Sequence, residues 1–191
     1  MEPLVLIGAS AGGLKALPVI CACLPANFSA PVLIVSHVGA RKSLLPEILS
    51  RHCPLPLRHA RDGEPVMPGR ILLAPPDWHM LVRRMKGQGM VCLSRGPKEH
   101  HTRPAIDPLF RSAASAYGAN VVGVILSGYL DDGTAGLQAI KAGGGKVVVQ
   151  APSDALAPSM PQSALDKVEV DWCLPADKIG PLLLALASSP P

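Results

Sequence analysis

At 191 residues the chain is long enough to bury the core of one domain, and we expect a single domain over residues 1–191. Aromatic residues make up only 3% of it, which argues against single-stranded nucleic-acid binding, because such sites stack bases on aromatic rings. The net charge of +4 is mild, and a solvated basic face explains it better than an acidic partner does.

The cysteines and the start of the chain bear on the cellular compartment. The five cysteines are odd in number and include no Cys-x-x-Cys pair, which favours a reduced chain. Residues 1–3 lead directly into the first predicted strand, so no signal peptide is expected. No apolar run approaches the ~18 residues that cross a bilayer. We therefore expect a soluble cytoplasmic protein, with no membrane insertion and no nucleic-acid partner.

The first strand, turn and helix place a serine where a nucleophile could act. Residues 4–7 form a short apolar run that predicts a buried strand, and Leu14 and Leu17, at helical spacing, predict an amphipathic helix. Ser10 lies on the turn between them. Its small neighbours let a substrate approach the hydroxyl, and the helix N-terminus would face an oxyanion formed there. Such a serine needs a base.

Two other interpretations of this turn compete with catalysis. A glycine-rich turn after a first strand often binds phosphate, but Gly8, Gly12 and Gly13 match neither G-x-G-x-x-G nor the P-loop. No acidic residue at the end of the next strand is placed to bind a ribose. Ser10 could also be a plain N-cap of the helix.

The second predicted strand, residues 32–35, ends at Ser36-His37. Ligands bind at the carboxyl ends of strands in open parallel sheets, so we expect His37 at the same edge as Ser10, with a structural histidine as the alternative. Residues 43–50 predict a short helix with Ser43 as its N-cap.

Residues 55–91 differ from the rest of the chain. They contain four short strand candidates separated by turns, over residues 57–60, 70–73, 79–83 and 90–93, and we interpret them as a β-hairpin insertion that carries much of the basic charge. The histidines in or near this segment, His52, His59 and His79, lack a metal-ligand spacing and are interpreted as structural or surface residues. His100 and His101 are adjacent, so their rings point apart, which argues against a metal.

The third strand end carries two carboxylates. Pro104 predicts the first position of a helix that runs to about residue 117. Residues 121–126 are the most strand-like run in the chain, and they lead through a polar, glycine-rich segment into a helix over 135–142. Asp131 and Asp132 lie in that segment.

The C-terminal part predicts strands at residues 146–150 and 168–173, a short helix after Pro161 and a last helix over 178–187. Alternating strands and helices of this kind predict an α/β fold. We expect a doubly wound, mostly parallel sheet with helices on both faces, together with the β-hairpin insertion.

Three strand ends thus offer Ser10, His37 and one of Asp131 or Asp132. These are the parts of a serine hydrolase: a nucleophile, a base, and a carboxylate that orients the base. Residues 8–12 formally read G-x-S-x-G, a weak signal alone because small residues recur in such turns.

The chain resembles the catalytic domain of the bacterial chemotaxis receptor protein-glutamate methylesterases over nearly its whole length. The matching segments are residues 8–13, the strand that ends in His37, and residues 62–64, 74–80, 103–110, 123–128, 132–136 and 160–161. So many matches in order make a specific signal.

The resemblance implies that Ser10 is the nucleophile, His37 the base, and Asp132, which precedes Gly133, the orienting carboxylate. The implied reaction is hydrolysis of glutamate γ-methyl esters on the cytoplasmic helices of methylated chemoreceptors, with release of methanol, and members also deamidate receptor glutamines. Backbone N–H groups near Ala11 and Gly12 would hold the oxyanion. No cofactor and no metal are implied.

Three departures from the family pattern matter. Better-known members have Thr at the position of Ala11 and Met at that of Tyr129, a change that bears on the oxyanion side or the substrate cleft. They also carry a phosphoacceptor receiver domain. Here the first strand starts at Leu4, so we expect no such domain and no control by phosphorylation within the chain; a separate signalling regulator is left open.

Two alternatives remain beside a stand-alone receptor methylesterase. One is a serine esterase or amidase of the same fold with a different substrate. The other is a non-enzymatic module that binds a signalling partner, against which the presence of Ser10, His37 and Asp132 argues.

Overall fold

The computed structural model describes residues 3–37 and 43–188. Seven strands form one sheet in the order β3-β4-β2-β1-β7-β8-β9, and every neighbouring pair is parallel. Their bounds are β1 Leu4–Ala9, β2 Val32–Ser36, β3 Leu57–His59, β4 Ile71–Leu73, β7 Val121–Ile125, β8 Lys146–Gln150 and β9 Trp172–Leu174. The sheet confirms the expected doubly wound α/β class.

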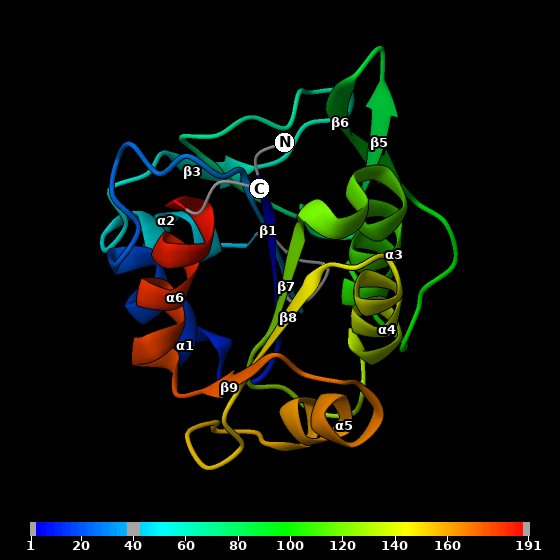
Figure 1. Ribbon diagram of the computed structural model, residues 1–191. Coiled ribbons are helices and arrows are strands. Elements are labelled where there is room, and N and C mark those ends of the chain that lie inside the picture. Colours follow the sequence, from blue (N-terminus) through cyan, green and yellow to red (C-terminus); the bar gives the residue numbers. More distant parts are fainter. Residues whose placement is uncertain (1–2, 38–42, 189–191) are drawn as a thin grey trace.

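Helices cover both faces of the sheet (Figure 1). One face packs against α1 (Gly13–Ala22), α2 (Leu45–Ser50) and α6 (Ala176–Ser188), and the other against α3 (Ile106–Tyr117), α4 (Thr134–Ala142) and α5 (Ser159–Lys167). A short 3-10 turn, Gly118–Asn120, leads from α3 into β7. None of the helices in the described ranges is both long and apolar enough to cross a membrane.

The central strand explains why there are two hydrophobic cores. Side chains alternate across a strand. On β1, Leu4 and Leu6 belong to the core under α3, α4 and α5, whereas Val5 and Ile7 belong to the core under α1 and α6. A strand buried on both faces has to be apolar throughout, which accounts for the continuous run read from the sequence.

The interpretation of residues 55–91 as a β-hairpin insertion is wrong in part. Only β5 (His79–Met85) and β6 (Gln88–Ser94) form the antiparallel hairpin, which packs on α3. The other two strand candidates became β3 and β4 and extend the main sheet beyond β2. Three-residue strands carry almost no pattern, and the pairing of β4 with β2, which brings β3 into the sheet, joins residues distant in sequence.

Two other boundaries differ from the sequence expectation. α3 begins at Ile106, two residues after Pro104, because Ala105 is extended (φ −120°, ψ 157°) and donates its N–H to Nδ1 of buried His79 at 3.2 Å. The last strand covers only Trp172–Leu174, since Asp171 turns inward to bind Val147 N–H at 2.8 Å. α2 begins at Leu45 with Leu44 at its N-cap position, so the prediction of Ser43 as the N-cap is wrong by one residue, although Ser43 Oγ accepts a hydrogen bond from Leu45 N–H at 3.2 Å.

Candidate active site

Ser10, His37 and Asp132 follow three adjacent strands at the centre of the sheet. Ser10 comes directly after β1 and His37 directly after β2, while Asp132 lies in the segment between β7 and α4. β1 is flanked by β2 on one side and by β7 on the other, so the chain order reverses here. Parallel sheets place ligand sites at the carboxyl edge of such a switch point.

The three side chains form a continuous hydrogen-bonded chain. Ser10 Oγ lies 2.9 Å from His37 Nδ1, and His37 Nε2 lies 2.7 Å from Asp132 Oδ2. With a proton on Nε2 bound to the carboxylate, Nδ1 is free to accept the serine proton. The ring nitrogens are exchanged relative to the Ser-His-Asp arrangement of chymotrypsin-like proteases, but the same proton transfer is available.

Asp132 is fixed in place by the start of α3. Its carboxylate is 1% exposed and accepts the N–H groups of Ile106 at 2.7 Å and of Asp107 at 3.0 Å. A helix N-terminus stabilises negative charge. Burial alone raises the pKa of Asp132, but the hydrogen bonds from His37, Ile106 and Asp107 lower it below its usual value. Asp132 therefore stays ionised beside His37.

Asp131, the other candidate, points elsewhere. Its side chain is 48% exposed, and its carboxylate oxygens lie 3.3 Å from His100 Nδ1 and 3.6 Å from Lys167 Nζ. The structure thus brings Asp132, and not Asp131, to His37.

The turn that carries Ser10 is held by Ser127. Ser10 N–H donates to Ser127 O at 2.9 Å, and Ser127 Oγ donates to Ala11 O at 2.6 Å. Gly12 has a φ of 85°, and a Cβ there would collide with Ser127 Oγ, so the turn requires glycine. The N–H groups of Ala11 and Gly12 donate to no acceptor within the described part of the chain.

The segment that carries Tyr129 lies against the same turn. A Cβ added to Gly128 would lie 2.8 Å from the Cβ of Ser10. Gly128 is anchored by its N–H to Ala157 O and by its carbonyl to Met160 N–H, both at 3.0 Å. Tyr129 itself is 65% exposed. Its backbone follows Gly128, which lies against the turn that carries Ser10.

Sequence reasoning assigned no role to several residues that build this site. Ser127 lies just before the end of the segment 123–128 that matches the family, but nothing in the sequence of that segment indicates that its hydroxyl would hold the turn of Ser10. The same is true of Gln150, whose Oε1 accepts Ser127 N–H at 2.8 Å, and of His100 and Asp107 behind Asp132. Ser127 and Gln150 share one local signal, a polar residue at or just after the end of a buried strand. His100, between β6 and α3, and Asp107, in the first turn of α3, do not share it.

One group of potential metal ligands lies beside the site. His100, Asp107 and Asp132 each offer an atom, and these atoms lie within 4.8 Å of one another. Each of the three is already hydrogen-bonded within the group or to a helix N-terminus, so we interpret the group as a charge network rather than as a metal site.

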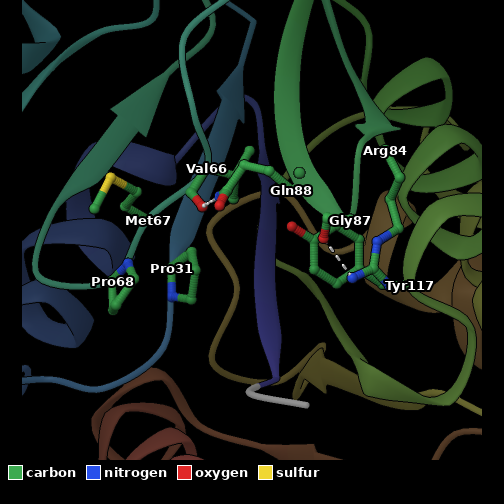
Figure 2. A pocket seen from close by; sticks show the side chains of 9 residues that line it. Pro31, Val66, Met67, Pro68, Arg84, Gly87, Gln88 and Tyr117 are labelled. Atoms are coloured by element: carbon green, nitrogen blue, oxygen red, sulfur yellow. Dashed lines mark hydrogen bonds between the residues drawn. The ribbon is translucent and has the colours of Figure 1, made fainter.

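A separate pocket lies at the opposite edge of the sheet. Figure 2 shows Arg84 and Tyr117 on one side of it and Pro31, Met67 and Pro68 on the other, around a cavity of about 240 Å³. Pro31 precedes the first residue of β2, so the pocket lies near the amino ends of the strands. Neither Ser10 nor His37 lines it.

Comparison with known proteins shows the family to which the chain belongs. The family model described as CheB methylesterase matches residues 5–183. A relative from Leptospira interrogans is 38% identical over 183 residues, which cover 95% of this chain and 93% of the relative. The protein-glutamate methylesterase/protein-glutamine glutaminase of Azospirillum brasilense is 36% identical over 186 residues, and this chain spans 47% of its length.

The fold agrees as well. The crystal structure of the Thermotoga maritima CheB methylesterase catalytic domain superposes with a TM-score of 0.93 at 33% identity, covering 97% of this chain and 99% of that one. With a family match over nearly all of its length and a shared fold, the chain belongs to the CheB methylesterase family.

Proposed function

We propose that this chain is a serine hydrolase that removes methyl esters from glutamate side chains of chemoreceptors and releases methanol. The observation that carries the proposal is the hydrogen-bonded chain of Ser10, His37 and Asp132 at the central switch point of a CheB methylesterase fold. Residues 1–191 would form one catalytic domain that needs no cofactor. Relatives named protein-glutamate methylesterase/protein-glutamine glutaminase support the substrate class.

The mechanism follows from the distances. His37 Nδ1, 2.9 Å from Ser10 Oγ, takes the serine proton as the oxygen attacks the ester carbonyl. The N–H groups of Ala11 and Gly12 hold the oxyanion, and each such donor contributes on the order of 3 kcal/mol. His37 then protonates the leaving methoxide, methanol departs, and water cleaves the acyl-enzyme by the same steps in reverse. Asp132 stabilises the imidazolium in both halves.

The same acyl chemistry would serve a glutamine side chain. Attack on the amide carbonyl gives the same glutamyl-enzyme, and His37 protonates an ammonia leaving group in place of methanol. This second reaction fits the glutaminase part of the relatives' names.

The surface around Ser10 suits a helical protein substrate. Tyr129, Leu130 and Leu156 are 65%, 65% and 61% exposed, and all three come from segments packed on the serine turn. Exposed apolar side chains gathered at one site mark an interaction surface. We propose that they contact the methylated cytoplasmic helices of a chemoreceptor, which places the reaction in the cytoplasm. A separate signalling regulator could act on the same surface.

The test is methanol release from a methylated chemoreceptor cytoplasmic fragment, with Ser10→Ala beside the wild type. Release by the wild type and none by Ser10→Ala supports both substrate and nucleophile. Equal release by both proteins removes Ser10 from its role. No release by either, together with Ser10-dependent hydrolysis of a small activated ester, would replace the receptor with another substrate, a possibility that Tyr129 and Ala11 keep open.

A further inference from the structure

A second buried carboxylate lies behind the Ser10–His37–Asp132 chain. Asp107, 1% exposed, accepts Gly136 N–H on its Oδ1 at 2.6 Å, in the first turn of α4. Asp132, which precedes α4, accepts two N–H groups in the first turn of α3. Asp107, in α3, therefore binds the N-terminus of α4, and Asp132, just before α4, binds the N-terminus of α3. The two helices hold both carboxylates close together.

Two buried carboxylates at this separation repel each other. One oxygen from each lies within 4.8 Å of the other. Like charges this close raise the pKa of at least one partner, and a neighbouring cation lowers it again. Burial raises the pKa of Asp107 most, the Gly136 N–H opposes that rise, the charge of Asp132 adds to it, and His100 opposes it.

His100 is the cation that the geometry provides. Its Nε2 lies 2.8 Å from Asp107 Oδ2 and 3.7 Å from Asp132 Oδ1, and its Nδ1 lies 3.3 Å from Asp131 Oδ1. Both ring nitrogens thus face carboxylate oxygens, which accept hydrogen bonds. Only the doubly protonated ring has a proton on each nitrogen.

The surrounding charges support the same protonation state. Burial alone lowers the pKa of His100, but the hydrogen bond to Asp107 and the charges of Asp132, Asp107 and Asp131 together raise it. The outer side is balanced by exposed cations: Arg111 Nη1 lies 4.0 Å from Asp107 Oδ2, and Lys167 Nζ lies 3.6 Å from Asp131 Oδ2. Arg111 is in turn paired with Glu99.

We propose that His100 is a positioning residue of the hydrolase. Its imidazolium neutralises the charge of Asp107, so that Asp132 stays fully ionised beside His37 and acts on His37 without a second negative charge next to it. This inference rests on the proposed function. Without the His100 charge the field at His37 becomes more negative. A more negative field favours the imidazolium of His37 over the free base that takes the serine proton.

The experiment compares two adjacent histidines. His100→Gln is tested beside His101→Gln, because both positions have positive φ, 48° and 61°, so that the substitution carries a similar backbone cost at each. His101 is exposed. The readout is the pH profile of kcat/KM for p-nitrophenyl acetate, with Ser10→Ala as the blank. We expect the acidic limb of His100→Gln to move up on the order of one pH unit, and that of His101→Gln to match the wild type.

A double variant separates charge from packing. In His100→Gln/Asp107→Asn both members of the ion pair become neutral, so the acidic limb should return toward that of the wild type. An unmoved limb in His100→Gln overturns the proposal, and so does a loss of rate that is uniform with pH and is not reversed in the double variant.

NMR of the His100 ring distinguishes failure of this inference from failure of the proposed function. We expect His100 to remain doubly protonated in the wild type above the pH at which free histidine loses its charge, and to lose its proton at lower pH in Asp107→Asn. A neutral His100 overturns the proposal whether or not the protein hydrolyses the ester. Absence of Ser10-dependent hydrolysis with a charged His100 overturns the hydrolase and, with it, the positioning role.

Discussion

Asp131 and Asp132 show how far two adjacent residues can differ. Asp132 is buried, bound to two helix N–H groups and 2.7 Å from His37, whereas Asp131 is half-exposed and paired with Lys167. The sequence pattern alone admits either residue. The difference arises from the direction in which the segment turns after β7, and only the resemblance to the family distinguished them beforehand.

We predict that Asp132→Asn lowers kcat about 10⁴-fold, the loss seen when a comparable orienting carboxylate is replaced. The amide no longer stabilises the imidazolium, although it can still accept one N–H from α3. Asp131→Asn should keep activity within about tenfold, because its charge reaches His37 only through His100. Steady-state hydrolysis of a small ester by both variants is the measurement. Comparable losses in the two would contradict the assignment of Asp132.

Gly128 matters because of its position between Ser10 and Met160. An added Cβ would lie 2.8 Å from Ser10 Cβ and 2.6 Å from Met160 Cε. Such contacts force the backbone or the side chains to move. A displacement of the order of 1 Å near reacting groups can cost about 10² in rate.

We predict that Gly128→Ala lowers kcat about 10²-fold while the protein still folds, at a cost of about 1–3 kcal/mol in the free energy of unfolding. Gly96→Ala is the matched control, since the nearest atom to its added Cβ is Ser94 Oγ at 3.4 Å. Ester hydrolysis and urea unfolding should be measured on both. Full activity in Gly128→Ala would show that the serine turn tolerates more movement than these contacts suggest.

At the scale of elements, helix N-termini do much of the positioning. α3 holds Asp132, α4 holds Asp107, and α1 begins at the turn that carries Ser10. Sequence reasoning located α1 from the spacing of Leu14 and Leu17 and α4 from the glycine-rich segment before it, and it placed the start of α3 at Pro104. The start at Ile106 depends on His79 and Asp132, which come from distant parts of the chain, and local propensity contains no information about them.

Asp171 joins three elements by a comparable arrangement. Its carboxylate accepts Lys141 Nζ of α4 at 2.7 Å and Val147 N–H of β8 at 2.8 Å, just before β9. Burial alone raises the pKa of Asp171, but these two partners lower it. The backbone N–H contributes more to stability than the solvent-screened lysine does.

We predict that Asp171→Ala lowers the free energy of unfolding by about 1–2 kcal/mol, chiefly through the unpaired Val147 N–H. Lys141→Ala should have a smaller effect, because it leaves that N–H bonded. Urea denaturation of both variants, with m-values compared, is the measurement. Equal effects of the two would assign the stabilisation to the ion pair instead.

At the scale of the whole molecule, the sheet order makes the site. β2, β1 and β7 are neighbours, so residues 10, 37 and 132 meet although they are far apart in sequence. The apolar runs of these strands and the polar residues after them could be predicted from the sequence. The addition of β3 and β4 to the sheet could not be predicted, because strands of three residues that pair with distant partners show no periodic pattern.

The charges of the whole molecule predict how its stability depends on pH. Burial alone raises the pKa of Asp132, Glu64 and Asp171, but hydrogen bonds and neighbouring cations lower it in all three. Their stabilisation is present above the unfolded carboxyl pKa of about 4 and is lost as pH falls through the folded values. The raised pKa of His100 acts in the other direction: its stabilisation is full below about pH 6.5 and is lost as pH rises through its folded value.

We therefore predict a maximum in Tm at mildly acidic pH, between about 4 and 6.5, with a decline on either side. Asp107, whose raised pKa also favours folding at low pH, weakens the acidic decline. The hydrogen bond with Cys21 lowers the pKa of Cys53 to about 7, so Cys53 also titrates on the alkaline side. The contribution of His100 to the change in Tm is therefore obtained as the difference between the wild type and His100→Gln. Thermal unfolding of both proteins over this range should give a flatter alkaline decline in the variant. Parallel curves would mean that folding does not raise the pKa of His100.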